Sequence, residues 1–322
     1  TLNAGAAGDI TIEGDVGGSS AALGAITVSN ADQVLFDETV TASSFTQSAA
    51  AATGLTTFDG VVDLTGNVDF TGQALTLNAA LGNGGTVEIT NAGTFTTAAA
   101  GDITSTGAFT QNGAGTNSLA GDITTTDSNI GFATAVTLVG PVALSTGSGA
   151  GDLTFGSTLD SDATSARVLT GSAGSGEINF DGAVGTTQAL AAVTISGLNV
   201  NADAGLRTNN GDIDFTGVTG STVLAGAIAT GGGDLIGAGT DFTNTGTITT
   251  GGGAVNLDGQ TGDINIDANI TTGGGVFTAT GASSFDSGGG DISTAGLANV
   301  AGGAITITTS TGDLRPGVFY TQ

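Results

Sequence analysis

Short runs of alternating apolar residues recur along this chain, and most are opened by the same triplet, Gly-Asp-Ile or Gly-Asp-Leu. The triplet occurs nine times, beginning at Gly8, Gly101, Gly121, Gly151, Gly211, Gly233, Gly262, Gly290 and Gly312. A longer signature, Ile-x-Thr-Gly-Gly-Gly, begins at Ile228, Ile248 and Ile270, with offsets of 248 − 228 = 20 and 270 − 248 = 22 residues. A repeat near twenty residues, made of short strands and glycine turns, is typical of a solenoid. The repeat therefore predicts a stack of coils.

The spacing of phenylalanine gives an independent estimate of the coil length. Successive members of one set lie 23, 23 and 25 residues apart: Phe109, Phe132, Phe155 and Phe180. In a parallel β-solenoid, equivalent positions on successive coils are separated by one strand spacing, roughly 4.8 Å. We therefore expect these rings to occupy one coil position and to stack into an internal ladder, with Ile178 and Ile264 also buried.

The composition favours strands and turns over helices. Glycine accounts for 59 of the 322 residues, and the acidic residues are almost all Asp, which suits turns, whereas Glu favours helices. We expect an all-β fold, a parallel β-helix (β-solenoid) with essentially no α-helix and about 20–25 residues per coil. At that length the 322 residues make roughly 13–16 coils.

No linker rich in proline or charge divides the chain, so we expect one elongated β-solenoid domain over residues 1–322. Residues 1–100 form the less regular part and residues 101–322 the regular coils. The pattern sets no coil boundaries in residues 31–60, which include the run Ala49–Ala52. A string of β-sandwich modules is the competing fold, but such modules run about 100 residues, and no repeat of that length is visible.

Charge and residue usage exclude several classes of partner. The net charge is −26, the only basic residues are Arg167, Arg207 and Arg315, and the chain has no Cys or His. Nucleic acid and anionic membranes would be repelled, and neither a disulfide framework nor thiol chemistry is available. No apolar run reaches the length of a membrane span. A chain without oxidisable sulfur suits an extracellular or cell-surface location. It begins at Thr1 without a signal peptide, as either a mature product or a segment of something longer.

Three segments resemble bacterial secreted β-strand-repeat proteins: residues 262–275 (GDINIDANITTGGG), residues 151–155 (GDLTF) and residues 176–184 (GEINFDGAV). These proteins belong with the filamentous-haemagglutinin-like and autotransporter-like right-handed parallel β-helices. The resemblance covers most of the chain from about Gly101 onward. It implies a right-handed coil, export across a bacterial envelope, and a role as an adhesin, a fibre or a matrix component. The amino-terminal secretion module of the two-partner-secretion branch is not recognisable here.

Two acidic pairs are the candidates for site chemistry, Asp160 with Asp162 and Asp212 with Asp214. Residues two apart on a strand share a face, so each pair could meet a sugar or supply oxygen ligands to Ca²⁺. Acids at turns, however, commonly cap backbone amides, and the chain lacks the His and Lys that solenoid lyases and hydrolases usually employ. We expect no enzyme and no cofactor, with calcium as the ion to test. A carbohydrate-active β-helix enzyme is a distant alternative.

The ends of the chain suggest self-assembly. A strand begins almost at once, with Ile10 and Ile12, and another strand-like stretch closes the chain after Arg315, with Val318, Phe319 and Tyr320. No capping element is visible, and soluble solenoids hide their edges. We expect a homopolymer joined head to tail through these residues, in an acidic structural subunit of a surface fibre. The alternative is an adhesin stalk or passenger domain for a host-surface or matrix glycan, with its binding specificity in irregular turns or outside this segment. The longest turns are expected at Ser161–Arg167 and Gly185–Ala192.

Overall fold

The computed structural model describes residues 1–18, 21–48, 54–296, 301–310 and 312–322, and these form strands and turns with no helix. Contacts divide the chain into two compact units, Thr1–Ser157 and Thr158–Gln322. Each unit is a parallel β-solenoid, and the coils of the two units make about 13 turns in all. The predicted fold class is confirmed, and the number of turns lies at the lower end of the expected range. The residues Ala49–Ala52 lie outside the described part of the chain.

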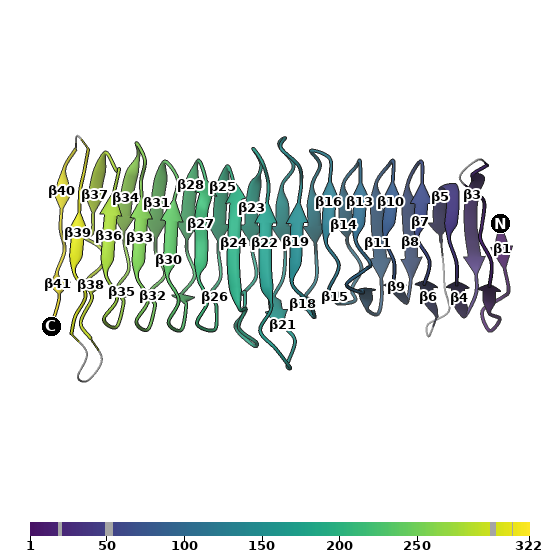
Figure 1. The fold of residues 1–322 in the computed structure, drawn as a ribbon, viewed down its shortest axis with the longest axis horizontal. Helices are drawn as coiled ribbons and strands as arrows, with labels where there is room; N and C mark the ends of the chain where they lie inside the picture. Colours follow the sequence, from purple (N-terminus) through teal and green to yellow (C-terminus); the bar gives the residue numbers. More distant parts are fainter. Residues whose placement is uncertain (19–20, 49–53, 297–300, 311) are drawn as a thin grey trace. The chain divides into compact units, whose positions relative to one another are not determined.

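In the N-terminal unit, strands of successive coils pair in parallel to form three ladders (Figure 1). The first ladder contains β3 (Leu23–Asn30), β5 (Val40–Gln47), β7 (Val62–Leu64), β10 (Leu81–Asn83), β13 (Ile103–Ser105), β16 (Ile123–Thr125) and β19 (Val142–Ser145). The second contains β1 (Leu2–Asn3), the same β3 and β5, β8 (Val68–Gly72), β11 (Val87–Asn91), β14 (Phe109–Gln111), β17 (Ile130–Phe132) and β20 (Leu153–Phe155). The third contains β2 (Ile10–Ile12), β4 (Gln33–Phe36), β6 (Leu55–Phe58), β9 (Ala74–Leu77), β12 (Phe95–Thr97), β15 (Asn117–Leu119) and β18 (Val136–Leu138).

The C-terminal unit has the same three-ladder plan. Its first ladder contains β22 (Val168–Ser172), β24 (Ala192–Gly197), β27 (Ile213–Val218), β30 (Leu235–Ala238), β33 (Val255–Asp258), β36 (Phe277–Thr280) and β39 (Ile305–Ile307). The second contains β23 (Glu177–Phe180), β25 (Asn199–Ala202), β28 (Ser221–Leu224), β31 (Asp241–Asn244), β34 (Asp263–Ile266), β37 (Ser284–Asp286) and β40 (Leu314–Arg315). The third contains β21 (Leu159–Ser161), a bridge at Val184, β26 (Leu206–Arg207), β29 (Ile228–Ala229), β32 (Ile248–Thr249), β35 (Ile270–Thr271), β38 (Ile292–Ser293) and β41 (Phe319–Tyr320).

The core consists of the alternate apolar residues of every ladder. Phe155, Ile178, Phe180 and Ile264 are buried, as predicted. Because side chains alternate between the two faces of a strand, the residues between them point outward. Within the N-terminal unit, Phe132 pairs in register with Phe155, and the two rings stack with centroids 5.6 Å apart.

The Phe132 ring packs on the Phe109 ring with centroids 5.3 Å apart, as the predicted ladder requires, but the predicted common coil position is wrong for Phe109. This residue pairs with Ile130, and Gln111 is the residue in register with Phe132. The coil between them is therefore 132 − 111 = 21 residues long, two fewer than the spacing of the two phenylalanines. A shift of two residues keeps the side chains of Phe109 and Gln111 on the inner face. The spacing between Phe109 and Phe132 therefore overestimates the length of this coil. The Gln111 side chain is buried and donates a hydrogen bond to Asn91 Oδ1 at 2.7 Å.

The Gly-Asp triplet holds each coil against the next. A Cβ added at Gly233 would lie 2.3 Å from the carbonyl oxygen of Gly211, so only glycine fits this approach. Asp212 Oδ1 accepts a hydrogen bond from the backbone amide of Asp234 at 2.8 Å, and Asp234 Oδ1 accepts one from Ala254 at 2.7 Å. The repeated acid therefore caps the start of the equivalent strand one coil later.

A column of buried threonine side chains, here called the threonine ladder, runs inside the C-terminal unit. Thr230, Thr250 and Thr272, each just before a Gly-Gly-Gly run, are fully buried. The hydroxyl of Thr250 donates to the carbonyl of Gly253 in its own turn and lies 3.2 Å from the carbonyl of Thr272 in the next coil. These threonines lie on the inner face of the coil, where their hydroxyls supply a donor to buried glycine carbonyls of the turns.

Candidate functional site

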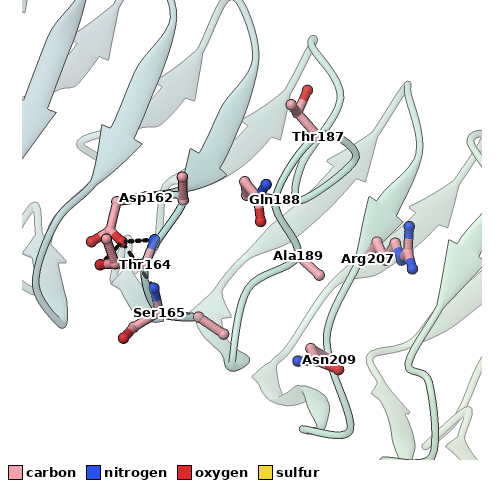
Figure 2. A pocket seen from close by; sticks show the side chains of 10 residues that line it. Asp162, Thr164, Ser165, Thr187, Gln188, Ala189, Arg207 and Asn209 are labelled. Carbon is pink, nitrogen blue, oxygen red and sulfur yellow. Dashed lines mark hydrogen bonds between the residues drawn. The ribbon is translucent and has the colours of Figure 1, made fainter.

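A polar hollow of about 380 Å³ interrupts the regular coils of the C-terminal unit. The turn at residues 162–166 lies on one side, the turn at residues 187–189 lies next to it, and Arg207 and Asn209 line the side away from Asp162 (Figure 2). These turns fall within the two long irregular turns that the sequence singled out. The regular coils that follow have shorter turns, so the hollow belongs to this part of the unit.

Asp162 fixes the first turn. Its Oδ1 accepts hydrogen bonds from the backbone amides of Thr164 and Ser165 at 2.7 and 2.9 Å, and also bonds the Thr164 hydroxyl (Figure 2). Its Oδ2 accepts from both Nε and an Nη atom of Arg167, at 2.9 and 2.6 Å. The Thr164 hydroxyl and the Arg167 guanidinium, with these amides, hold the pKa of Asp162 well below its usual range. The carboxylate is thus charged, paired and occupied by the turn.

Asp160 fixes the second turn in a similar way. Its Oδ1 accepts hydrogen bonds from the backbone amides of Thr187 and Gln188, at 3.0 and 3.1 Å. The backbone amide of Ser161, between the two acids, donates to the Gln188 carbonyl at 3.1 Å. Asp160 and Asp162 therefore lie on one outward face, as the spacing predicted, but each holds a different wall of the hollow.

Arg207 and Asn209 come from the next coil of the same unit. The Leu190 amide donates to the Arg207 carbonyl at 3.2 Å, and the Asn209 amide donates to the Leu190 carbonyl at 2.8 Å, so this segment is bound to the end of the second turn. The side chains of Arg207 and Asn209 are both exposed. Within the described residues, the Arg207 guanidinium makes no ion pair or hydrogen bond, whereas Arg167 and Arg315 each face a carboxylate.

The second acidic pair lies on β27 and the residue before it. Asp212 caps the amide of Asp234, as described above, and Asp214 Oδ1 accepts from the amide of Thr216 at 2.8 Å. Across the part of the chain that the structure describes, no group of three or more acidic or other metal-ligating side chains comes together. All four predicted acids therefore accept backbone amides, and of the four only Asp162 lines the polar hollow.

In the N-terminal unit, the predicted interface residues Ile10 and Ile12 lie on β2, which pairs with β4 and is half-buried. Ile12 lines an apolar hollow of about 130 Å³ together with Leu2, Leu23 and Phe36. Within the described residues, β2 has a strand partner on one side only. This first coil thus exposes both strand edge and apolar surface.

In the C-terminal unit, the other predicted interface residues belong to or precede β40 and β41, which pair with β37 and β38. The exposed fraction is 50% for Val318, 36% for Phe319 and 50% for Tyr320. Arg315 extends into solvent with its guanidinium 3.6 Å from the Asp313 carboxylate. Among the residues described, β40 and β41 also have a strand partner on one side only.

Comparison with known proteins identifies no relative of this solenoid. In the described ranges, the structure contains no helix of the length and hydropathy needed to span a lipid bilayer. No protein-family model, no curated protein and no solved structure matches the chain.

Proposed function

We propose that this protein is structural: an acidic, extracellular β-solenoid subunit of a bacterial surface fibre, in which copies join end to end. The observation that supports this proposal is that the first and last coils of the described residues, here called the open coils, contain strands with a partner on one side only. One exposes Val318, Phe319 and Tyr320, and the other exposes an apolar hollow beside Ile12. Strand edges that lack a partner readily pair with another chain, and a heterologous contact that does not close on itself propagates as a filament.

The chemistry of the two open coils is complementary. Arg315 lies beside the exposed aromatic strand, while Asp9, Glu13 and Asp15 are exposed around β2. Tyr and Arg are favoured at the centres of protein interfaces. An arginine of one copy facing the acids of the next would set the direction of stacking, and Phe319 would be removed from water.

The side chains that repeat along the coils support a structural role. The Asx caps and the buried threonines bind one coil to the next, and the acids that could serve a carbohydrate-active enzyme accept backbone amides. We therefore place the chain among rigid structural repeats. The resemblance to bacterial secreted β-strand-repeat proteins, which implies a right-handed coil and export, is part of the same proposal.

The test is a point substitution on the exposed strand. We expect wild-type protein to form filaments visible by negative-stain electron microscopy and Phe319→Asp to remain monomeric, because a buried unpaired carboxylate opposes the contact. Val276→Asp is the matched control, since Val276 is exposed in the same unit, 42% accessible, and gains the same charge away from β41. Equal filament formation by both variants would refute this junction.

A second candidate function is supported by the polar hollow. The stalk or passenger domain of an adhesin would carry its binding specificity where the coils are irregular, and residues 162–166 and 187–189 form such a place. In this reading the regular coils hold the hollow away from the cell surface, and a host-surface or matrix glycan is the partner.

A further inference from the structure

We propose that the hollow between the turns at residues 162–166 and 187–189 binds an acidic sugar residue, with Arg207 contacting its carboxylate. This inference rests on the second candidate function, whose glycan it specifies, and it is independent of the fibre proposal, because β40 and β41 do not line the hollow. It rests on three observations: the free charge of Arg207, the fixed walls of the hollow, and the free polar groups that line it.

Charge is the first observation. In a chain of net charge −26, a guanidinium would be expected to find a carboxylate, and Arg167 and Arg315 do so at 2.6 and 3.6 Å. Arg207 has no such partner among the described residues, although it is exposed and lines the hollow. The planar guanidinium fork matches a carboxylate with two parallel hydrogen bonds. An anion bound in the hollow can therefore form an ion pair with the Arg207 guanidinium.

The carboxylates near the hollow do not make it a cation site. Both oxygens of Asp162 are occupied, one by the Arg167 guanidinium and the other by the first turn. Asp160 Oδ1 accepts the amides of Thr187 and Gln188. A cation would therefore compete with hydrogen bonds that shape the turns, whereas an anion at Arg207 breaks none.

Fixed walls are the second observation. Asp160 and Asp162 each hold a turn by two amide hydrogen bonds, so the walls of the hollow are shaped by contacts within the protein itself. A preformed site avoids the entropic cost of ordering loops on binding. The volume of about 380 Å³ is within the range of small-molecule sites, and it suits one or two sugar rings.

Free polar groups are the third observation. The side chains of Ser165, Thr187, Gln188 and Asn209 are exposed and make no hydrogen bond within the described structure. Their hydroxyl and amide groups both donate and accept, as sugar hydroxyls require. No aromatic ring lines the hollow, so stacking cannot supply the affinity. The charged contact at Arg207 must provide most of it, which favours an acidic sugar over a neutral one.

The test uses trigalacturonate as the probe and the neutral galactose trisaccharide of the same linkage as its control, with binding measured by titration calorimetry. We expect the wild-type chain to bind the acidic probe in preference to the neutral one, more weakly as salt rises. Arg207→Gln should weaken binding by about tenfold. Val276→Asp changes the net charge by the same amount outside the hollow and should leave binding unchanged.

Equal binding of the two probes, equal affinity of Arg207→Gln and Val276→Asp, or no binding of trigalacturonate would each overturn the proposal. An intact β circular-dichroism spectrum of Arg207→Gln keeps the comparison valid, and Asn209→Ala, which leaves all charges in place, should weaken binding by a few-fold. Repeating the titration with Phe319→Asp separates this site from the fibre. Binding retained by that variant supports the hollow whether or not filaments form, and binding lost with it would place the sugar at the junction between copies and overturn the site.

Discussion

At the scale of single residues, Asp162 shows how an acid of this chain acts as a structural group. Four protein groups contact its carboxylate: the Thr164 hydroxyl, the Arg167 guanidinium, and the amides of Thr164 and Ser165. All of them favour the charged form, so the pKa of Asp162 lies below its usual range. The Ser284 and Ser283 hydroxyls lower the pKa of Asp263 in the same way. The hydrogen bonds that these two acids accept are therefore strongest while the acids are ionised.

A depressed pKa fixes the sign of the pH dependence of stability at Asp162. The contribution of the ionised carboxylate is fully present above the pKa of an unfolded Asp, about 3.9, and is lost as the pH falls from there toward the lower pKa of the folded state. Asp162→Asn should therefore lower the urea midpoint at neutral pH, and the difference from wild type should shrink below about pH 4. Asp203→Asn, which removes the same charge at an exposed position, is the control. A difference between wild type and Asp162→Asn that stays constant down to pH 3 would contradict the account.

At the scale of the coil, the threonine ladder adds side-chain hydrogen bonds between the turns of successive coils. The hydroxyls of Thr230 and Thr250 each lie between the carbonyl of a glycine in their own turn and the carbonyl of the threonine one coil later. The strands of this ladder are only two residues long, for example β32 and β35. The hydroxyls therefore supplement a short run of backbone hydrogen bonds.

Replacing Thr250 by Val keeps the size of the side chain and removes its hydroxyl. The carbonyl of Gly253 then loses its donor, whereas the carbonyl of Thr272 keeps the amide of Gly252 at 2.6 Å, so we expect the free energy of unfolding to fall by about 1–3 kcal/mol. Thr249→Val is the matched control, because Thr249 is the adjacent residue and points outward. The comparison is made by urea unfolding, and equal effects of the two substitutions would show that the ladder adds nothing to stability.

The sequence predicts the coil well where each residue serves the repeat itself. Residues such as Gly233 and Asp234 recur because many coils share a close backbone approach and a cap, and that recurrence is visible without a structure. Register between coils is less predictable, because a change of coil length by two residues leaves the inward and outward alternation unaltered. Phe109 and Gln111 both point inward, and spacing alone could not tell which one pairs in register with Phe132.

The candidate site was only partly predictable for a related reason. The sequence identified both irregular turns and placed Asp160 and Asp162 on one face, but it gave no role to Arg207. Its position depends on the length of the preceding coil and on pairing between Leu190 and Thr208, which no repeat specifies. The sequence feature that could have pointed to Arg207 is the rarity of basic residues, because the chain has only three.

At the scale of the whole molecule, negatively charged residues greatly outnumber positively charged ones. The net charge is −26, and equivalent strands in adjacent coils lie roughly 4.8 Å apart. Acids that cap successive coils, such as Asp212 and Asp234, are therefore brought closer together by folding than they are in an extended chain. Their repulsion opposes the folded state and is weakened by dissolved ions.

We expect the melting temperature to rise by several degrees between about 0.01 M and 1 M NaCl, as the Debye length falls from about 30 to 3 Å. Thermal unfolding followed by circular dichroism at neutral pH measures the effect. Mg²⁺ and Ca²⁺ at matched ionic strength distinguish screening from a specific site, since diffuse neutralisation of outward carboxylates gives the two ions similar shifts. A larger stabilisation by Ca²⁺ than by Mg²⁺ would instead indicate a calcium site, to be sought at Asp212 and Asp214, whose remaining carboxylate oxygens face outward. A melting temperature that is independent of salt would contradict this account. It would show that the repulsion among the acidic side chains is no larger in the folded coils than in the unfolded chain.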